Sequence, residues 1–323
     1  MKKKKVLVTY KMPIEGYAEL LKDFDVTFSE GQSFTEQEVM EVIQDYDALL
    51  SMFDFKVTKE LIDKATRLKI VSNYAVGYDN VDVNYCTEKG IQVTNTPEPV
   101  TQPTADQAMG LLLAVSRNIA LCDRKLRTPG ALKWGLLENL GLSIHGKTLG
   151  IIGMGRIGKA LALRATACGM RIVYNNRKRV SLEEEKQYQA TWLPYDELIA
   201  TADCISLNAP LTPETYHIIG EREFERMKKN AIVINTARGP LIDEEALVRA
   251  LKKGHIWGAG LDVFELGEVL HPELLTLDNV VLNPHTGTQT FEVRHEMSVI
   301  ASQNIIHFFE GKEPIFRVNH LDK

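Results

Sequence analysis

Short apolar segments alternate with segments of helical period along almost the whole chain. In the first third, the apolar runs are VLVTY (6–10), DALLSM (47–52), KIVSNYAVG (69–77) and IQVTNTP (91–97). Farther along, the strand candidates are TLGIIG, RIVYN, CISLNAP, AIVINTA, GAGLDV and VVLNPH, again separated by helical patterns. Such alternation predicts parallel strands joined by crossover helices. The strands lack strict polar alternation, which predicts that helices cover both faces of each sheet.

A proline-rich stretch, TPEPVTQP (96–103), interrupts this pattern. Prolines at this spacing rarely occur inside a helix, so we expect a linker here. A long apolar helix should follow, with Thr104 as its N-cap, and one further helix over 290–311 should close the chain. We therefore predict an α/β fold of two Rossmann-like or flavodoxin-like domains with parallel sheets. In this arrangement 103–289 is inserted into a domain made of 1–102 and 290–323.

Composition and charge exclude several classes of protein. The net charge is −5 and the isoelectric point about 6.0, so no basic field predicts binding to nucleic acid. The sequence contains no run of about 18 apolar residues, so it predicts no membrane span. The apolar stretch after the opening lysines is broken at Lys11 and is too short for a signal peptide. The four cysteines lie far apart, at Cys86, Cys122, Cys168 and Cys204. Their spacing predicts neither a zinc knuckle nor a disulfide framework. We therefore expect buried free thiols in a cytoplasmic protein.

Three glycines in G-x-G-x-x-G spacing follow a predicted strand and open a predicted helix: Gly153, Gly155 and Gly158. The spacing alone is a weak signal, but this context indicates a dinucleotide-binding loop. The first glycine permits a tight turn, the second lets the backbone approach a pyrophosphate, and the third lets helix and strand pack closely. We expect the N–H groups of Arg156 and Ile157 to point at phosphate oxygens. A glycine-rich turn with a purely structural use is the alternative.

The next predicted strand ends about twenty residues past that loop, where a dinucleotide fold normally carries an acid for the ribose hydroxyls. The sequence instead continues with two neutral residues, Asn175 and Asn176, and then with Arg177, Lys178 and Arg179. An acid would repel a 2′-phosphate, whereas a guanidinium can pair with it through two hydrogen bonds. We therefore predict that Asn176 and the three cations bind NADP in preference to NAD. A solvated loop with NAD bound through weaker contacts is the alternative.

Two polar residues after predicted strands suit the reduction of a 2-oxo acid. Such a reduction needs a cation for the substrate carboxylate and carbonyl, an acid that protonates the oxygen, and a carboxylate that holds this acid. Arg238 follows the strand in NTARGPLIDEEAL, and His285 follows the strand in NPHTGTQT. Ligands bind at the carboxyl ends of strands in such sheets, so both residues are candidates for catalysis.

Several stretches resemble the D-isomer-specific 2-hydroxyacid dehydrogenases in the family's order: GMGRIG, NTARGPLIDEEAL, GAGLDVFE and NPHTG, together with SNYAVGYDNVD and TNTPEPVTQPTADQA. The basic turn is similar to that of the NADP-linked glyoxylate and hydroxypyruvate reductases. The resemblance implies that Arg238 grips carboxylate and carbonyl oxygen and that His285 donates the proton. It also implies that Val76 and Gly77 offer backbone N–H groups to the substrate carboxylate. Asp262 would contact the nicotinamide carboxamide, and the cofactor cleft would be lined by Thr104, Pro210 and Thr236.

One position departs from the family's pattern. The family places its His-orienting glutamate five residues after the aspartate that ends the strand, and counting from Asp262 gives Gly267. Glu268 lies one position later and Glu265 two earlier. A shift of one residue is tolerable in a loop, so we expect Glu268 to orient His285, with Glu265 or no carboxylate as the alternatives.

The leading hypothesis is a cytoplasmic, NADP-linked reductase of a small 2-oxo acid such as glyoxylate or hydroxypyruvate. The alternatives are an NAD-linked dehydrogenase of another 2-hydroxy acid and a dinucleotide-sensing interaction protein without turnover. Phosphoglycerate is a less attractive substrate, because little sequence follows the last helix for a regulatory domain. Loops at 74–78 and at Met52 and Phe53 could limit substrate size. The segment 127–146, with Trp134, resembles the family's dimer-forming extension, so we expect a homodimer.

Overall fold

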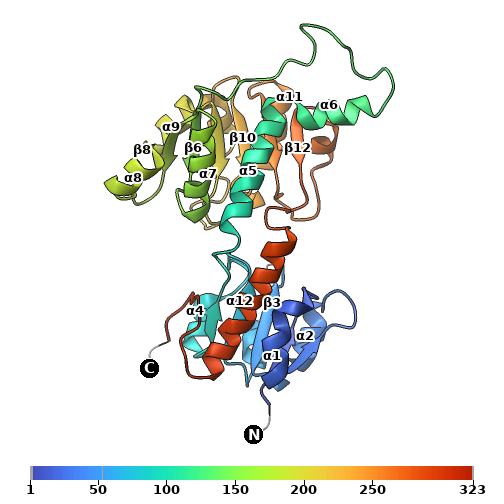
Figure 1. Cartoon of the computed structure of the whole chain (residues 1–323), viewed down its shortest axis with the longest axis vertical. Helices are drawn as coiled ribbons and strands as arrows, with labels where there is room; N and C mark the ends of the chain where they lie inside the picture. Colours follow the sequence, from blue (N-terminus) through green and yellow to red (C-terminus); the bar gives the residue numbers. More distant parts are fainter. Residues whose placement is uncertain (1–2, 53, 322–323) are drawn as a thin grey trace. The chain divides into compact units, whose positions relative to one another are not determined.

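The computed structural model describes residues 3–52 and 54–321 and divides into two compact units (Figure 1). Unit 1 consists of Met1–Val100 and Thr288–Lys323, and unit 2 of Thr101–Gly287. Each unit is an α/β fold with a fully parallel sheet, so the predicted fold class is confirmed. Both predicted boundaries lie close to these divisions. Within the described residues, no helix is long and apolar enough to cross a membrane.

Unit 1 contains a five-stranded sheet in the order β2-β1-β3-β4-β5. Its strands are β1 (Lys5–Val8), β2 (Asp25–Phe28), β3 (Ala48–Met52), β4 (Ile70–Tyr74) and β5 (Gln92–Thr94). The central strands β3 and β4 are buried throughout, as strands covered on both faces must be. The register places Leu49 between Leu7 and Val71, so apolar side chains adjoin across the sheet.

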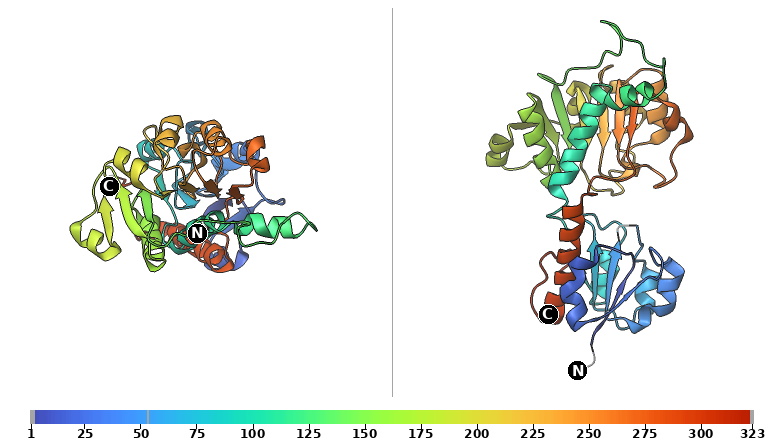
Figure 2. Two further views of the ribbon diagram at one scale, coloured as in Figure 1. Left: turned by 90° about the horizontal axis from the view of Figure 1, so that it is seen from above. Right: turned by 45° about the vertical axis from the view of Figure 1, so that its right-hand side comes forward.

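Helices cover both faces of this sheet. One face packs on η2 (Ile43–Asp45), α2 (Glu36–Val42), α3 (Lys59–Lys64) and α4 (Val83–Glu88). The other packs on η1 (Ile14–Tyr17), α1 (Ala18–Asp23) and α12 (Phe291–Phe309), which lie side by side (Figure 2). The last helix therefore returns to the N-terminal strands, with Thr290 as its N-cap and Ala301 and Ile305 fully buried.

Unit 2 contains a seven-stranded sheet in the order β12-β11-β10-β9-β6-β7-β8. The strands are β6 (Thr148–Ile152), β7 (Arg171–Asn175), β8 (Ala190–Trp192), β9 (Cys204–Leu207), β10 (Ile232–Asn235), β11 (Gly258–Leu261) and β12 (Val280–Leu282). The strand order reverses between β6 and β9, and such a switch point opens a crevice at the carboxyl ends of the strands.

Two separate apolar cores cover the two faces of the larger sheet. One core includes α5 (Thr101–Ser116) and α7 (Arg156–Ala167), which Figure 1 shows side by side. The other includes α9 (Tyr195–Thr201), α10 (Glu221–Arg226) and α11 (Glu244–Lys252). The remaining elements are α6 (Ile119–Leu126), α8 (Leu182–Tyr188), η3 (Gly239–Leu241) and η4 (Pro272–Thr276).

The structure corrects three expectations. The long apolar helix is two helices, α5 and α6, separated at Asn118, whose φ of 53° is left-handed. Helix α5 begins at Thr101, so Pro103 lies in its first turn, where the missing N–H is tolerated. Thr104 is consequently not the N-cap but a buried residue inside the helix. Of the four cysteines, Cys168 is exposed and Cys122 half-buried, so only the other two are buried thiols.

Candidate active site

The glycine loop joins β6 to α7 at the switch point of the unit 2 sheet. Gly153 has a left-handed φ of 99°, and a Cβ there would lie 2.6 Å from the Ala209 backbone nitrogen. A Cβ on Gly158 would lie 2.4 Å from the Gly153 carbonyl oxygen, so only glycine lets the helix pack this closely. Gly155 is the N-cap of α7, and a Cβ there would meet only open space. The backbone is therefore accessible beside the first helical residues, Arg156 and Ile157, where a pyrophosphate would bind.

Two buried oxygens at the neighbouring strand ends have no hydrogen-bond partner among the described residues. They are Oδ1 of Asn208, just after β9, and Oγ1 of Thr236, just after β10. Buried polar atoms are rarely left unpaired, so each such atom is a candidate for contact with a ligand. The cradle at Gly155 and these two acceptors fit a dinucleotide lying across the switch point. Pro210 is exposed in the same loop as Asn208, and its carbonyl accepts from the Thr215 hydroxyl at 2.7 Å.

The two asparagines at the end of β7 have structural roles. Oδ1 of Asn176 accepts a hydrogen bond from the Met154 N–H at 2.6 Å, which ties the glycine loop to the neighbouring strand. Asn175 Nδ2 donates to the Leu193 carbonyl at 2.8 Å. Asn175 uses a donor that a carboxylate lacks, whereas the acceptor role of Asn176 would also suit an aspartate.

The three cations that follow differ in their surroundings. Arg179 pairs through two hydrogen bonds, at 2.6 and 2.7 Å, with Glu185, which also accepts from the Tyr174 hydroxyl at 2.8 Å. The Arg179 hydrogen bonds hold the pKa of Glu185 below its usual range. Arg177 and Lys178 are exposed, and neither forms a hydrogen bond or ion pair with the described residues. The pKa of Glu214 is lowered chiefly by its hydrogen bond with Thr212 and also by the charge of Arg177, so a carboxylate lies near this cation without pairing with it.

Arg238 lies in a tightly held loop after β10. The Asn235 side chain accepts from the Ala237 N–H at 3.0 Å and donates to the Arg238 carbonyl at 2.8 Å. Nη1 of Arg238 donates to the Ala237 carbonyl at 2.8 Å. A Cβ on Gly239 would lie 1.8 Å from the Phe264 carbonyl oxygen, so the loop packs directly against the segment after β11. The half-buried guanidinium of Arg238 is thereby held at the carboxyl edge of the sheet.

His285 lies in the loop after β12, and Asp262 fixes this loop. His285 is half-buried and has a left-handed φ of 57°, an uncommon conformation that the surroundings must impose. The buried Asp262 carboxylate accepts from the Thr286 and Gly287 N–H groups, both at 2.8 Å, and from the Thr286 hydroxyl at 3.2 Å. Burial raises the pKa of Asp262 despite these hydrogen bonds. Thr104 lies at the same place, with Cγ2 3.6 Å from a Cβ built on Gly287.

The structure does not bring Glu268 to His285. Glu268 is exposed and makes no hydrogen bond or ion pair within the part of the chain that the structure describes. It lies in a tight turn, in which the Val269 N–H donates to the Leu266 carbonyl at 3.3 Å. Gly267 has a left-handed φ of 65° there, where glutamate would be strained. The turn therefore explains the glycine, and the role of Glu268 stays a prediction.

The other candidate, Glu265, binds a residue that the sequence did not single out. Its Oε1 lies 2.6 Å from Nε2 of His217, and its Oε2 accepts from the Glu244 N–H at 3.1 Å. In return, Glu244 accepts from the Glu265 N–H at 2.6 Å. Burial raises the pKa of Glu244 more than this hydrogen bond lowers it. We call these three residues the Glu265 cluster; nothing in the sequence marks His217, because its partner lies 48 residues away.

The predicted substrate-binding backbone belongs to unit 1. Val76 and Gly77 follow β4, and their carbonyls accept from Asn95 Nδ2 at 2.9 Å and from Asn73 Nδ2 at 2.8 Å. Among the described residues, neither of their N–H groups has a hydrogen-bond acceptor. All other predicted site residues lie in unit 2. Phe53, expected to limit the substrate, lies outside the described residues.

Comparisons with known proteins identify a matching family model, similar relatives and similar solved structures. Residues 109–287 match the family model of the D-isomer specific 2-hydroxyacid dehydrogenase, NAD binding domain. A glyoxylate reductase of Thermococcus onnurineus is 45% identical over 322 residues, covering 98% of this chain and 96% of the relative. The crystal structure of a glyoxylate reductase from Paecilomyes thermophila is similar with a TM-score of 0.90 and 34% identity, covering 98% and 99% of the two chains. An NADPH-dependent glyoxylate/hydroxypyruvate reductase from Sinorhizobium meliloti, solved with NADP and malonate, is similar with a TM-score of 0.86 and 31% identity, covering 98% and 97%.

Proposed function

The chain belongs to the D-isomer-specific 2-hydroxyacid dehydrogenase family of oxidoreductases, and we propose that it reduces glyoxylate or hydroxypyruvate with NADPH. The observation that carries this proposal is the gathering of the glycine loop, Arg238 and His285 at the carboxyl edge of one sheet. A dinucleotide fold with a cation and an imidazole at that edge has the groups that hydride transfer to a 2-oxo acid requires.

A nicotinamide dinucleotide held at the glycine loop would supply the hydride for C2 of the substrate. Arg238 binds the substrate carboxylate and draws electron density toward the carbonyl oxygen, so that C2 becomes more electrophilic. His285 transfers its proton to that oxygen, and the product is a 2-hydroxy acid. Asp262 holds the loop of His285 through the backbone of Thr286 and Gly287. The N–H groups of Val76 and Gly77 are the donors proposed for the substrate carboxylate.

The preference for NADP is proposed from Arg177 and Lys178. Both cations are exposed after β7, and neither forms a hydrogen bond or ion pair with the described residues, although the charge of Arg177 acts on the nearby Glu214 carboxylate. Arg179 already forms two hydrogen bonds with Glu185, so the proposal rests on the other two cations. NAD-linked turnover of another 2-hydroxy acid is the second candidate, because Asn175 and Asn176 would not repel a ribose without the 2′-phosphate.

The segment 127–146 supports a homodimer. Four of its large apolar side chains are exposed: Trp134 at 86%, Leu136 at 93%, Leu137 at 79% and Leu140 at 59%. Such exposure on neighbouring residues is typical of surfaces that a partner covers. We propose a second copy of the chain as that partner. Trp134→Ser together with Leu136→Ser should then produce monomers in sedimentation velocity, whereas an unchanged dimer would show that another surface joins the subunits.

A panel of 2-oxo acids assayed with NADPH and with NADH tests the proposed function. We expect consumption of NADPH with glyoxylate or hydroxypyruvate, and a lower kcat/KM with NADH. Arg238→Met should lower kcat/KM for both acids because it removes the carboxylate's counter-charge. Tight binding of NADPH without turnover of any 2-oxo acid would instead support the dinucleotide-sensing alternative.

A further inference from the structure

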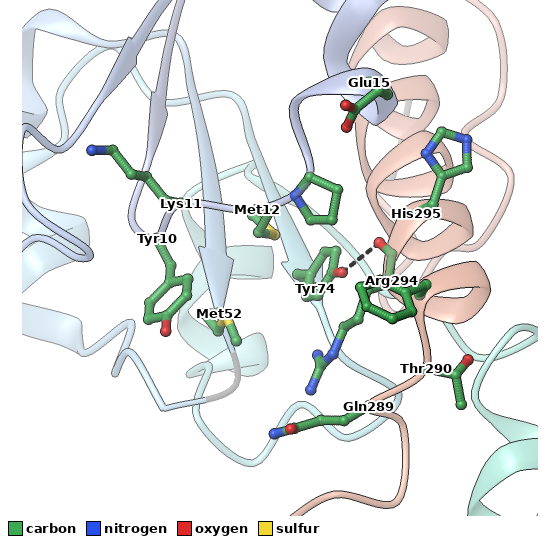
Figure 3. Close-up of a pocket in the computed structure, with 12 residues that line it drawn as sticks. Tyr10, Lys11, Met12, Glu15, Met52, Tyr74, Gln289, Thr290, Arg294 and His295 are labelled. Carbon is green, nitrogen blue, oxygen red and sulfur yellow. Dashed lines mark hydrogen bonds between the residues drawn. The ribbon is translucent and has the colours of Figure 1, made fainter.

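Unit 1 contains a pocket of about 660 Å³ at the carboxyl edge of its sheet (Figure 3). Its walls come from the segment after β1, the end of β3 at Met52, the end of β4 at Tyr74 and the first turn of α12. Ligands of open parallel sheets bind at this edge. The volume lies within the range of roughly 300–1,000 Å³ in which proteins hold ligands much larger than glyoxylate.

Arg294 lines this pocket, and one of its donor nitrogens is unpaired. Its Nη1 is buried and has no hydrogen-bond partner among the described residues. The Tyr74 hydroxyl donates to the Arg294 carbonyl at 2.6 Å, and the guanidinium lies 5.8 Å from the Tyr74 ring centroid. Figure 3 shows the guanidinium pointing away from α12 into the pocket. A buried charged donor without an acceptor is unfavourable, so an anionic ligand atom would stabilise this arrangement.

Of the charged groups that line the pocket, Arg294 is the one best placed to bind an anionic ligand. Lys11 Nζ already donates to the Glu30 carbonyl at 2.9 Å. Glu15 and His295 lie at the other end of the pocket in Figure 3, away from the guanidinium. Much of the remaining wall is apolar or aromatic: Met12, Pro13, Met52, Tyr74 and Phe291. The pocket therefore suits an aliphatic chain that ends in an anion.

We propose that this pocket holds the side chain of the 2-oxo acid and that Arg294 pairs with a second carboxylate on it. The substrate class would then be 2-oxo dicarboxylic acids, with glyoxylate as a minimal substrate that leaves the pocket empty. This inference rests on the proposed function, since it names the side chain of the same substrate. Arg294 is accordingly a specificity-determining residue and takes no part in proton or hydride transfer.

The test compares two acids of the same shape that differ in charge. In 5-methyl-2-oxohexanoate, an isopropyl group replaces the distal carboxylate of 2-oxoglutarate. With NADPH as the reductant and the wild-type protein, we expect the dicarboxylic acid to have a kcat/KM about tenfold or more above that of its neutral analogue, because a charge-assisted hydrogen bond forms. Arg294→Met should abolish this preference, and Arg294→Lys should keep part of it.

Lys11→Met is the matched control, since it removes the same charge from the same pocket but from a side chain that is already hydrogen-bonded. It should alter the ratio between the two acids by much less than Arg294→Met does. Thermal unfolding shows whether each variant is folded. If Arg294→Met does not fold, the ratio of the two kcat/KM values of the wild type tests the inference by itself. A wild-type ratio near one, or a ratio that survives Arg294→Met, overturns the inference even if glyoxylate is reduced. Absence of turnover with glyoxylate and both longer acids would instead reject the proposed function.

Discussion

Replacing Glu265 by alanine should loosen the loop that carries Arg238. The Glu265 cluster joins three segments: the loop of His217, the N-terminus of α11 at Glu244, and the segment after β11. The His217 N–H in turn donates to the Pro240 carbonyl at 2.8 Å, two residues beyond Arg238. Removing the carboxylate of Glu265 therefore lowers the stability of unit 2. It also shifts the Arg238 guanidinium, which is proposed to bind the substrate carboxylate.

The magnitude follows from the two hydrogen bonds that Glu265→Ala removes. The bond to His217 joins side chains that are only 30% and 22% exposed, and the bond from the Glu244 N–H satisfies a donor at a helix start. Together their loss should lower the free energy of unfolding by about 2–3 kcal/mol. For a unit of this size, that corresponds to a fall of roughly 4–12 °C in Tm. Glu265→Gln keeps an acceptor for the Glu244 N–H and should lose about half as much.

Calorimetry and steady-state kinetics test this prediction together. We expect Glu265→Ala to raise KM for glyoxylate by about tenfold, since a misplaced cation weakens substrate binding, with little change in the Kd of NADPH. Glu268→Ala is the stability control, because it removes the same charge three residues away from a side chain that is exposed and makes no hydrogen bond or ion pair with the described residues. It should change the free energy of unfolding by no more than about 0.5 kcal/mol. Equal Tm and KM values for Glu265→Ala and the wild type would refute the reasoning.

Four further substitutions separate the roles of neighbouring residues. Arg177→Asp should weaken NADPH relative to NADH by about tenfold or more in equilibrium titrations, whereas Arg179→Ala should chiefly lower Tm, because that guanidinium binds a carboxylate of α8. Asp262→Asn places an amide opposite buried N–H groups and should lower the free energy of unfolding by about 1–3 kcal/mol. It should also lower kcat, because the His285 loop shifts. Thermal unfolding and turnover measured on one preparation check both effects. If Glu268 reaches His285 during turnover, Glu268→Gln should lower kcat without changing Tm, and an unaltered pH profile would count against that prediction.

Most strands could be predicted from apolar runs because they lie in the sheet interiors. The runs at 148–153 and 171–175 coincide with β6 and β7 almost residue for residue. The strands β2 and β8 were missed, since both are sheet edges whose side chains are mostly half-buried or exposed. An edge strand needs only one neighbour and carries a weaker apolar signal. The fold class is thus visible in the sequence, and so are the edge strands β5 and β12, while the more exposed edges β2 and β8 are not.

The candidate site could be predicted only where a motif places residues beside one strand end. The glycine loop, Arg238 and His285 follow strands directly, so the parallel topology alone brings them to one edge. The pairing of Arg179 with Glu185 and of Glu265 with His217 depends on side-chain directions across different elements. Sequence spacing contains no information on these directions, so it could not predict that Arg179 pairs with Glu185 or that Glu265 pairs with His217.

The most direct test mixes the preformed NADPH complex of the wild type, and of His285→Ala, with glyoxylate in a single turnover. We expect both proteins to bind NADPH with similar Kd values. We also expect the wild type to consume one NADPH per glycolate formed, and His285→Ala to do so at least about 100-fold more slowly. Failure of the wild type to bind either NADPH or NADH, or reduction of glyoxylate by His285→Ala at the wild-type rate, would contradict the proposed roles of the glycine loop and of His285.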